Sequence, residues 1–274
     1  MARLCNITAA ILIFSTARIQ AQNSSPNSGN GLPPPPPPPV LFPKTVPTPA
    51  KPAISPAPAI APAPGPWKTL FDGTTISGFR GLQKTDFLKS GWKIVDGALL
   101  LTKSVKESGK QTGGDLITTE AYTDFEFSFE WKMEVSGNSG VLYLPRASVG
   151  QKPTGHEFQL IDDVRNPDGL KGGPIKRTGA LYGILAPGEE KELNDGKWNE
   201  GRLVIQGNHV EHWINGSKVL EYELESPALQ KAMAESKTKL PMGFGKKFKA
   251  PVMLLDQGED IAFRNLKIRQ IAPK

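Results

Sequence analysis

From Trp67 to the C-terminus, apolar and polar side chains alternate in several short runs, which is the pattern of β-strands with one buried face. Within residues 124–132, aromatic side chains occupy every second position and polar ones stand between them. In His156–Ile161, Phe158 and Leu160 share one face, and Glu157 and Gln159 share the other. Residues 201–222 and 263–271 alternate in the same way. These runs predict antiparallel strands.

Turn and helix signals complete the prediction. Asn215-Gly216 separates two apolar runs, and both residues tolerate the positive φ of a type I′ hairpin turn. One short helix is predicted near residues 226–237, because Ser226 is a good N-cap and Pro227 suits the first helical position. Many short strands with glycine turns and a single helix predict an all-β fold, an antiparallel sandwich of jelly-roll type.

The first 66 residues have a different composition and contain no acidic residue. Arg3, an apolar stretch over residues 7–17 and the small Ala21 predict a signal peptide over residues 1–21, and hence a secreted or periplasmic protein. Residues 22–66 hold 17 of the 26 prolines and are predicted to be a disordered linker with polyproline II character. A spacer is favoured over a ligand for a proline-binding domain. The folded domain is predicted to span residues 67–274.

Charge and cysteine content narrow the function. Four of the 33 basic residues precede Trp67, so residues 67–274 carry 29 basic against 27 acidic residues, a net charge of +2. This near balance argues against a nucleic-acid partner. Cys5 is the single cysteine and lies in the predicted signal peptide, so disulfides and thiol chemistry are excluded from the mature chain. No later segment resembles a transmembrane helix.

Seven short motifs occur in the order found in one known family. They are WKTLFDGTTISGF at 67–79, GNSG at 137–140, EFQLIDD at 157–163, GALY at 179–182, GKWN at 196–199, VEHWING with VLEY at 210–222 and FRNLKI at 263–268. With them the chain resembles the 3-keto-disaccharide hydrolase domain family over residues 67–271. The resemblance implies a concanavalin A-like jelly roll with a sugar site on one sheet, and cleavage of glucosides already oxidised at C3.

Such a cleavage needs a base that removes the C2 proton acidified by the ketone, and donors that hold the resulting enolate. Glu157 is the first candidate for this base. Asn138, Gln159, Tyr182 and Asn199 are candidates for holding hydroxyls or the enolate oxygen. His212 is a second acid–base candidate, although its place between two apolar residues slightly favours a buried structural histidine.

Four further residues are candidates for sugar contact. Tyr143 and Trp198 can stack on a sugar ring, although aromatic residues at strand spacing are more often core. Asp256 and Gln257 occupy the part of the chain that resembles the family's LLQDHG motif, with Gln257 where histidine is usual.

Two other positions also depart from the family pattern, with Asn166 in place of histidine and Leu142 in place of lysine. Because Asn and Gln cannot transfer protons near neutral pH, the alternative is a carbohydrate-binding module on a proline-rich stalk. A surface interaction domain without a sugar role ranks third.

The oxygen-rich stretch at residues 162–169 is a candidate calcium site through Asp162, Asp163 and Asp168, with a polar turn as the simpler interpretation. No histidine pair has zinc spacing. No other cofactor is expected. The expected partner is an oxidised glucoside or another carbohydrate, and no sequence feature specifies an oligomeric state.

Overall fold

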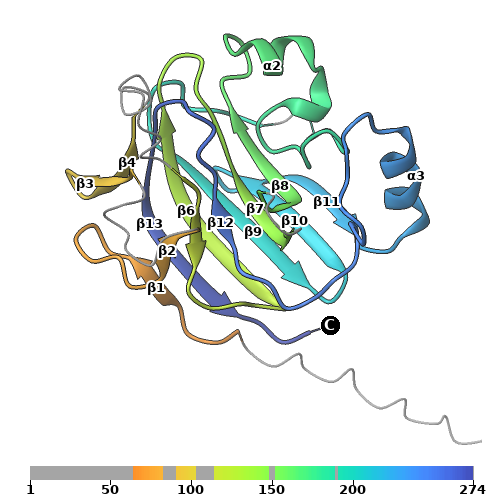
Figure 1. The fold of residues 1–274 in the computed structure, drawn as a ribbon, viewed down its shortest axis with the longest axis horizontal. Helices are drawn as coiled ribbons and strands as arrows, with labels where there is room; N and C mark the ends of the chain where they lie inside the picture. The colour runs from red at the N-terminus through yellow and green to blue at the C-terminus, as the bar shows by residue number, and fades with distance from the viewer. Residues whose placement is uncertain (1–63, 83–90, 103–113, 148–151, 189–190, 274) are drawn as a thin grey trace, which may run out of the picture. The chain divides into compact units, whose positions relative to one another are not determined.

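The computed structural model describes residues 64–82, 91–102, 114–147, 152–188 and 191–273. The predicted signal peptide and almost all of the predicted linker lie outside these residues. The described chain forms two antiparallel sheets that pack face to face (Figure 1). The all-β sandwich predicted from the alternating runs is therefore confirmed.

The larger sheet has eight strands. Its order is β11 (Ser217–Glu223), β10 (His209–Ile214), β9 (Asn199–Gln206), β6 (Phe125–Met133), β13 (Ile261–Gln270), β4 (Ala98–Leu101) and β3 (Lys93–Val95), and β1 (Lys68–Phe71) also pairs with β13.

The smaller sheet has five strands in the order β2 (Phe79–Gly81), β5 (Leu116–Thr118), β12 (Met253–Leu254), β7 (Asn138–Arg146) and β8 (Thr154–Ile161). Residues 179–182 lie beside β8 at the edge of this sheet. Tyr182 N donates to the Glu157 carbonyl at 3.0 Å, and Gly179 N donates to the Gln159 carbonyl at 2.8 Å. This segment extends the sheet beyond β8.

The core lies between the sheets and is rich in aromatic side chains. Phe125, Phe127, Phe129 and Trp131 all point inward from β6 and are almost completely buried. Phe129 meets Phe158 of the opposite sheet edge to face, with ring centroids 5.7 Å apart. The period-two pattern of β6 thus supplies most of one wall of the core.

A directional chain of hydrogen bonds also crosses the core. His156 accepts from Gly245 N and donates through Nδ1 to the Tyr222 hydroxyl at 2.7 Å. Tyr222 donates to the Tyr143 hydroxyl at 2.8 Å, and Tyr143 donates to His212 Nε2 at 2.7 Å. The chain ends where His212 Nδ1 donates to the Gly179 carbonyl at 2.9 Å. Every polar atom in it has a partner, as burial requires.

Two α-helices lie outside the sheets in the described part of the chain. The predicted helix is confirmed as α3 (Pro227–Glu235), with the Ser226 side chain accepting from Leu229 N. The other, α2 (Pro167–Lys171), was not predicted and is followed by a 3-10 turn, η2 (Pro174–Lys176). Asn166 caps α2 by accepting from Asp168 N. Neither helix is long and apolar enough to cross a membrane.

The predicted hairpin is also confirmed. β10 and β11 flank Asn215 and Gly216, whose φ angles of 48° and 83° are those that a type I′ turn requires.

Replacing Tyr143 by Phe tests the buried hydrogen-bond chain, because only the central hydroxyl is removed and the volume is kept. His212 Nε2 and the Tyr222 hydroxyl then each lose a partner inside the core. We expect the free energy of unfolding to fall by about 1–3 kcal/mol in urea titrations. Tyr122→Phe is the matched control, since the Tyr122 hydroxyl makes only a 3.4 Å contact with Glu120. An equal effect of both substitutions would contradict the assignment.

Candidate active site

Glu157 projects from the outer face of the smaller sheet. Cross-strand pairing aligns it with Leu142 of β7, which pairs in turn with Met253 of β12, and Met253 pairs with Ile117 of β5. Residues paired directly across strands share a face, so these side chains form one row. Its apolar members are buried, and the carboxylate of Glu157 therefore stands at the end of an apolar row.

Gly140 makes room for this carboxylate. It lies on β7 opposite Gln159, and a Cβ atom placed there would come within 2.6 Å of Glu157 Oε1 and 3.0 Å of Glu157 Cγ. Any side chain at this position would compete with Glu157 for the same space.

Two amide side chains hydrogen-bond to Glu157, and a third lies beside one of them. Gln257 Nε2 donates to Glu157 Oε1 at 3.1 Å. Gln159 is fully buried, and with its amide nitrogen turned towards the carboxylate it donates to Glu157 Oε1 at 3.1 Å and to the Ser139 carbonyl at 2.9 Å. The Gln159 oxygen then faces the Asn138 side-chain amide at 3.2 Å. A single carboxylate thus lies among neutral hydrogen-bonding groups.

Burial raises the pKa of Glu157 to about 7. The ammonium of Lys152 and the hydrogen bond from Gln257 oppose this rise, whereas the charges of Asp115 and Asp168 add to it. Lys152 Nζ pairs with Asp115 Oδ1 at 3.0 Å, and burial raises the pKa of Asp115 as well. A group with a pKa near 7 can both accept and return a proton at neutral pH.

A second polar group stands beside Glu157. Tyr182 follows β8 in the extended sheet, and its hydroxyl donates to Asp168 Oδ2 at 2.7 Å. Lys176 Nζ donates to the other Asp168 oxygen at 2.5 Å and lies over the Tyr182 ring, 5.3 Å from its centroid. Burial and the hydrogen bond to Asp168 raise the pKa of Tyr182, so its hydroxyl stays protonated.

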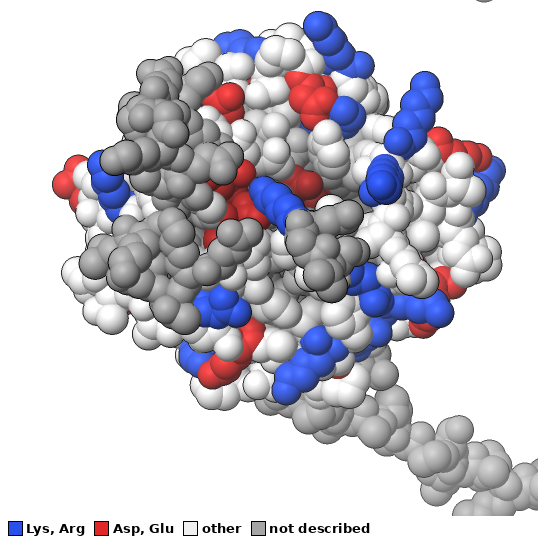
Figure 2. Space-filling view, viewed as in Figure 1, with Lys and Arg blue, Asp and Glu red and all other residues white. Residues whose placement is uncertain are grey.

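Figure 2 views the molecule from the side where β12 crosses in front of the larger sheet. It shows acidic and basic side chains gathered near the middle of that face.

Comparison with known proteins identifies the family. The sequence profile of the 3-keto-alpha-glucoside-1,2-lyase-like domain matches residues 66–269. The chain belongs to this family. A curated relative from Bacteroides thetaiotaomicron, named 3-keto-disaccharide hydrolase, is 30% identical over 224 residues, which cover 73% of this chain and 77% of the relative.

Solved structures agree with the fold of this family. A candidate glycosyl hydrolase from Parabacteroides distasonis superposes with a TM-score of 0.65 at 28% identity, covering 75% of this chain and 94% of the other. A second candidate glycosyl hydrolase from the same organism gives a TM-score of 0.55 at 24% identity, covering 75% and 100% of the two chains, and supports the fold alone.

Five of the predicted site residues come together in this family member. They lie on β7, on β8, on the segment beyond β8 and on the turn after β12, and they are Asn138, Glu157, Gln159, Tyr182 and Gln257. Asp256 shapes that turn, because its backbone N donates to Asp115 Oδ1 at 2.9 Å and its side chain accepts from Gly258 N at 2.9 Å.

Four predicted residues lie elsewhere. Tyr143 and His212 are fully buried members of the hydrogen-bond chain between the sheets, so neither reaches the outer face. Burial lowers the pKa of His212 to about 4, and the ring is neutral. Asn199 begins β9 in the larger sheet and accepts from Asn194 N, while Trp198 stacks against Arg264 of β13 at 4.1 Å. Both therefore lie at the larger sheet, whereas Glu157 is carried by the smaller sheet.

The three aspartates proposed as calcium ligands do not converge. Asp162 accepts from Ser136 N at 2.8 Å and pairs with Arg165, and Asp163 accepts from Thr178 N at 2.7 Å and pairs with Lys191. Asp168 is bound by Lys176 and Tyr182. In the described part of the chain these three residues do not form a shared ligand set. The simpler interpretation of this stretch as a polar turn fits the structure.

Asp115, Lys152 and Lys176 were not predicted from the sequence. Asp115 immediately precedes β5, Lys152 lies just before β8, and Lys176 is the last residue of η2. None of the three belongs to a recognised motif. The fold brings Asp115 and Lys152 close enough to affect the pKa of Glu157, and it brings Lys176 onto Asp168 and Tyr182.

Glu157→Gln tests the raised pKa through stability. Because the folded state holds this proton more tightly than the unfolded chain, the contribution of Glu157 to stability falls as pH rises from about 4.5 to about 7. We expect the variant to be more stable than the wild type by about 1–2 kcal/mol at pH 8 and nearly equal at pH 4, as measured by urea unfolding. The exposed Glu235→Gln serves as control. A variant that is less stable at pH 8 would refute the raised pKa.

Proposed function

We propose that this protein cleaves glycosides whose glucose unit carries a ketone at C3, with Glu157 as the proton-transferring residue. The observation that carries the proposal is one carboxylate with a pKa of about 7 among three amide side chains. Membership of the 3-keto-alpha-glucoside-1,2-lyase-like family and the name of the Bacteroides thetaiotaomicron relative support the same substrate class.

The arrangement suits elimination better than ordinary glycoside hydrolysis. Ordinary glycosidases use two carboxyl groups, one as acid and one as base or nucleophile. Here the neighbouring Asp115 pairs with Lys152, and Asp168 is bound by Lys176 and Tyr182. Glu157 is therefore the carboxyl group best placed to exchange protons, and a reaction that needs one base fits this site.

The proposed reaction proceeds in two steps. Ionised Glu157 removes the proton from C2, the electrons pass into the C3 carbonyl as an enolate, and the bond from C1 to the glycosidic oxygen breaks as the enolate collapses. The leaving oxygen takes up a proton, which protonated Glu157 can return. Water then adds across C1 and C2, giving the 3-keto sugar and the free alcohol, so that one water is consumed for each bond cleaved.

The other residues would bind and orient the sugar. The amides of Asn138 and Gln257 would hold hydroxyls or the enolate oxygen, since neutral donors stabilise a developing oxyanion without competing for its proton. Gln159, which is buried and donates to Glu157 and to the Ser139 carbonyl, would orient the carboxylate. Tyr182 would contact the substrate beside Glu157. Gln257 stands where the family usually has histidine, and its amide cannot transfer a proton, so Glu157 carries the proton transfers in this member.

Export to the periplasm or the cell exterior belongs to this proposal, on the strength of the positively charged and apolar start of the chain. The proline-rich stretch that follows would act as a spacer.

Activity on paired substrates tests the reaction. The purified protein should release the alcohol from a 3-keto-glucoside and not from the unoxidised parent glucoside. Glu157→Gln should lower kcat/KM by at least 100-fold, and the wild-type kcat/KM should rise with pH through an apparent pKa near 7. Glu235→Gln should match the wild type. Saturable binding of the sugar without release would instead indicate a carbohydrate-binding module.

Gly140→Ala tests the position of the carboxylate rather than its presence. The added methyl group would occupy the space of Glu157 Oε1 and displace a flexible side-chain end, so the fold should persist. We expect kcat/KM to fall at least tenfold while the urea midpoint changes little. Gly188→Ala is the control, since its added Cβ would meet only the Val219 carbonyl at 3.5 Å. Unchanged activity in Gly140→Ala would contradict the proposed role of Glu157.

A further inference from the structure

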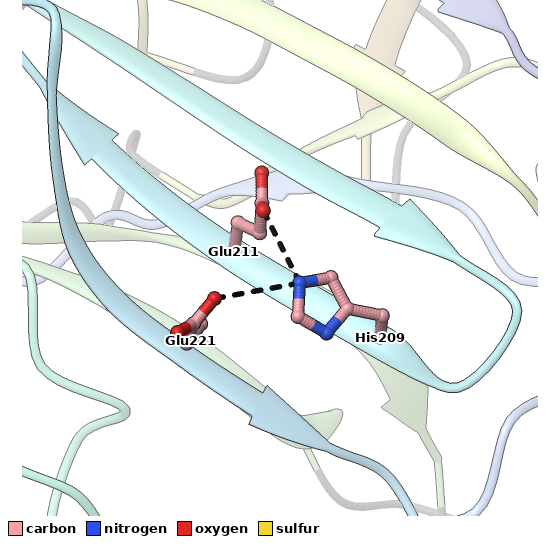
Figure 3. Close-up of side chains that lie close together, drawn as sticks. All are labelled: His209, Glu211 and Glu221. Atoms are coloured by element: carbon pink, nitrogen blue, oxygen red, sulfur yellow. Dashed lines mark hydrogen bonds and ion pairs between the residues drawn. The ribbon is translucent and has the colours of Figure 1, made fainter.

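A cluster of histidine and glutamate side chains lies on the hairpin of β10 and β11, in the larger sheet (Figure 3). His209 Nε2 lies 3.1 Å from Glu211 Oε1 and 3.7 Å from Glu221 Oε2. All the potential ligand atoms lie within 4.8 Å of one another. None of these residues belongs to the site around Glu157.

The hydrogen bond made by Nδ1 determines which nitrogen of a neutral His209 ring carries the proton. His209 Nδ1 lies 2.7 Å from Glu223 Oε1, and a carboxylate can only accept, so the proton is on Nδ1. In the neutral ring Nε2 then carries a lone pair, and that lone pair faces two carboxylate oxygens. A cation bound at this place would take the position of a second ring proton, which otherwise joins Nε2 to Glu211 Oε1 at 3.1 Å.

The spacing suits a small divalent ion. Zinc bonds to histidine nitrogen and carboxylate oxygen at about 2.0–2.2 Å, so neighbouring ligand atoms around a tetrahedral ion are roughly 3.3–3.5 Å apart. The two distances from Nε2, 3.1 and 3.7 Å, lie on either side of this value. The two carboxylate oxygens lie within 4.8 Å of each other, so they would move towards the ion when it binds.

Outer groups hold two of the three residues in place. Glu223 fixes the His209 ring from behind, and Trp213 Nε1 donates to Glu211 Oε2 at 2.8 Å, which leaves Glu211 Oε1 to face the ring. A carboxylate behind a metal-bound histidine is a recurrent arrangement that fixes the tautomer and orients the ring.

We propose that His209, Glu211 and Glu221 bind a divalent transition-metal ion of the zinc class, which ties β10 to β11. Lys218 is the competing cation, because its Nζ lies 3.4 Å from Glu211 Oε1 and also pairs with Glu221 Oε2. The ion takes the place of this ammonium between the two carboxylates. With one nitrogen and two oxygen ligands, the site favours zinc over calcium, which prefers six or more oxygens.

Calorimetric titration of the full-length, untagged, metal-stripped protein with Zn²⁺ at pH 7.5 tests the site. We expect one zinc ion per chain, with Ca²⁺ bound at least tenfold more weakly. His209→Gln and Glu221→Gln should each weaken zinc binding at least tenfold, and Glu223→Gln should weaken it by about 10–100-fold through the ring orientation. Lys218→Met should bind zinc more tightly than the wild type, because the competing charge is removed.

Glu235→Gln, on the exposed surface of α3, is the matched control and should bind zinc like the wild type. Thermal unfolding without metal checks that each variant is folded, and only folded variants are compared. Zinc affinity unchanged by His209→Gln, or absent from the wild type, would overturn the proposal. Weaker zinc binding by the Lys218→Met variant would contradict the position proposed for the ion, between the carboxylates of Glu211 and Glu221. Zinc affinity is measured without substrate, so these results do not depend on the activity proposed for Glu157.

Discussion

The alternation of side chains along β8 couples the core of the sandwich to its outer face. His156, Phe158 and Leu160 are buried between the sheets, and the residues between them, Glu157 and Gln159, necessarily face outward. A shift of one residue in the register of β8 would place a carboxyl group in the core and an aromatic ring outside, which strongly disfavours the shifted register. The face of the sheet on which Glu157 lies is therefore set by the packing of its neighbours on the strand.

The buried hydrogen-bond chain constrains the core in a second way. Burial lowers the pKa of His156 to about 3, so this ring is neutral and can donate through only one nitrogen. The direction of every bond from Gly245 to Gly179 then follows, because each hydroxyl donates once along the chain. A polar network of this kind tolerates a single arrangement of the two sheets. It holds β7 and β8 against β10, and thereby holds the strands that carry Asn138 and Glu157.

Local signals were sufficient to predict the strands, the hairpin at Asn215-Gly216 and helix α3, because each depends on neighbouring residues. Strand periodicity also placed Glu157 and Gln159 on one face. Strand periodicity could not separate the inner face of one sheet from the outer face of another, and for that reason it only slightly favoured a buried structural role for His212 over an acid–base role. Helix α2 was missed because its few residues resemble a polar turn, and its cap Asn166 is apparent only once the helix is seen.

The pKa of Glu157 depends on a balance between burial and nearby charge, which the strand pattern does not predict. Burial beside the apolar row of Leu142, Met253 and Ile117 favours the neutral carboxyl group, whereas Lys152 favours the charged form. Because Lys152 is already paired with Asp115, its effect on Glu157 is reduced and burial prevails. The nearby amides can hydrogen-bond to both the charged and the neutral carboxyl group, so they do not determine whether Glu157 is protonated. A carboxyl group held near the midpoint of its titration, with neutral hydrogen-bonding partners, is suited to accept and return one proton at a sugar.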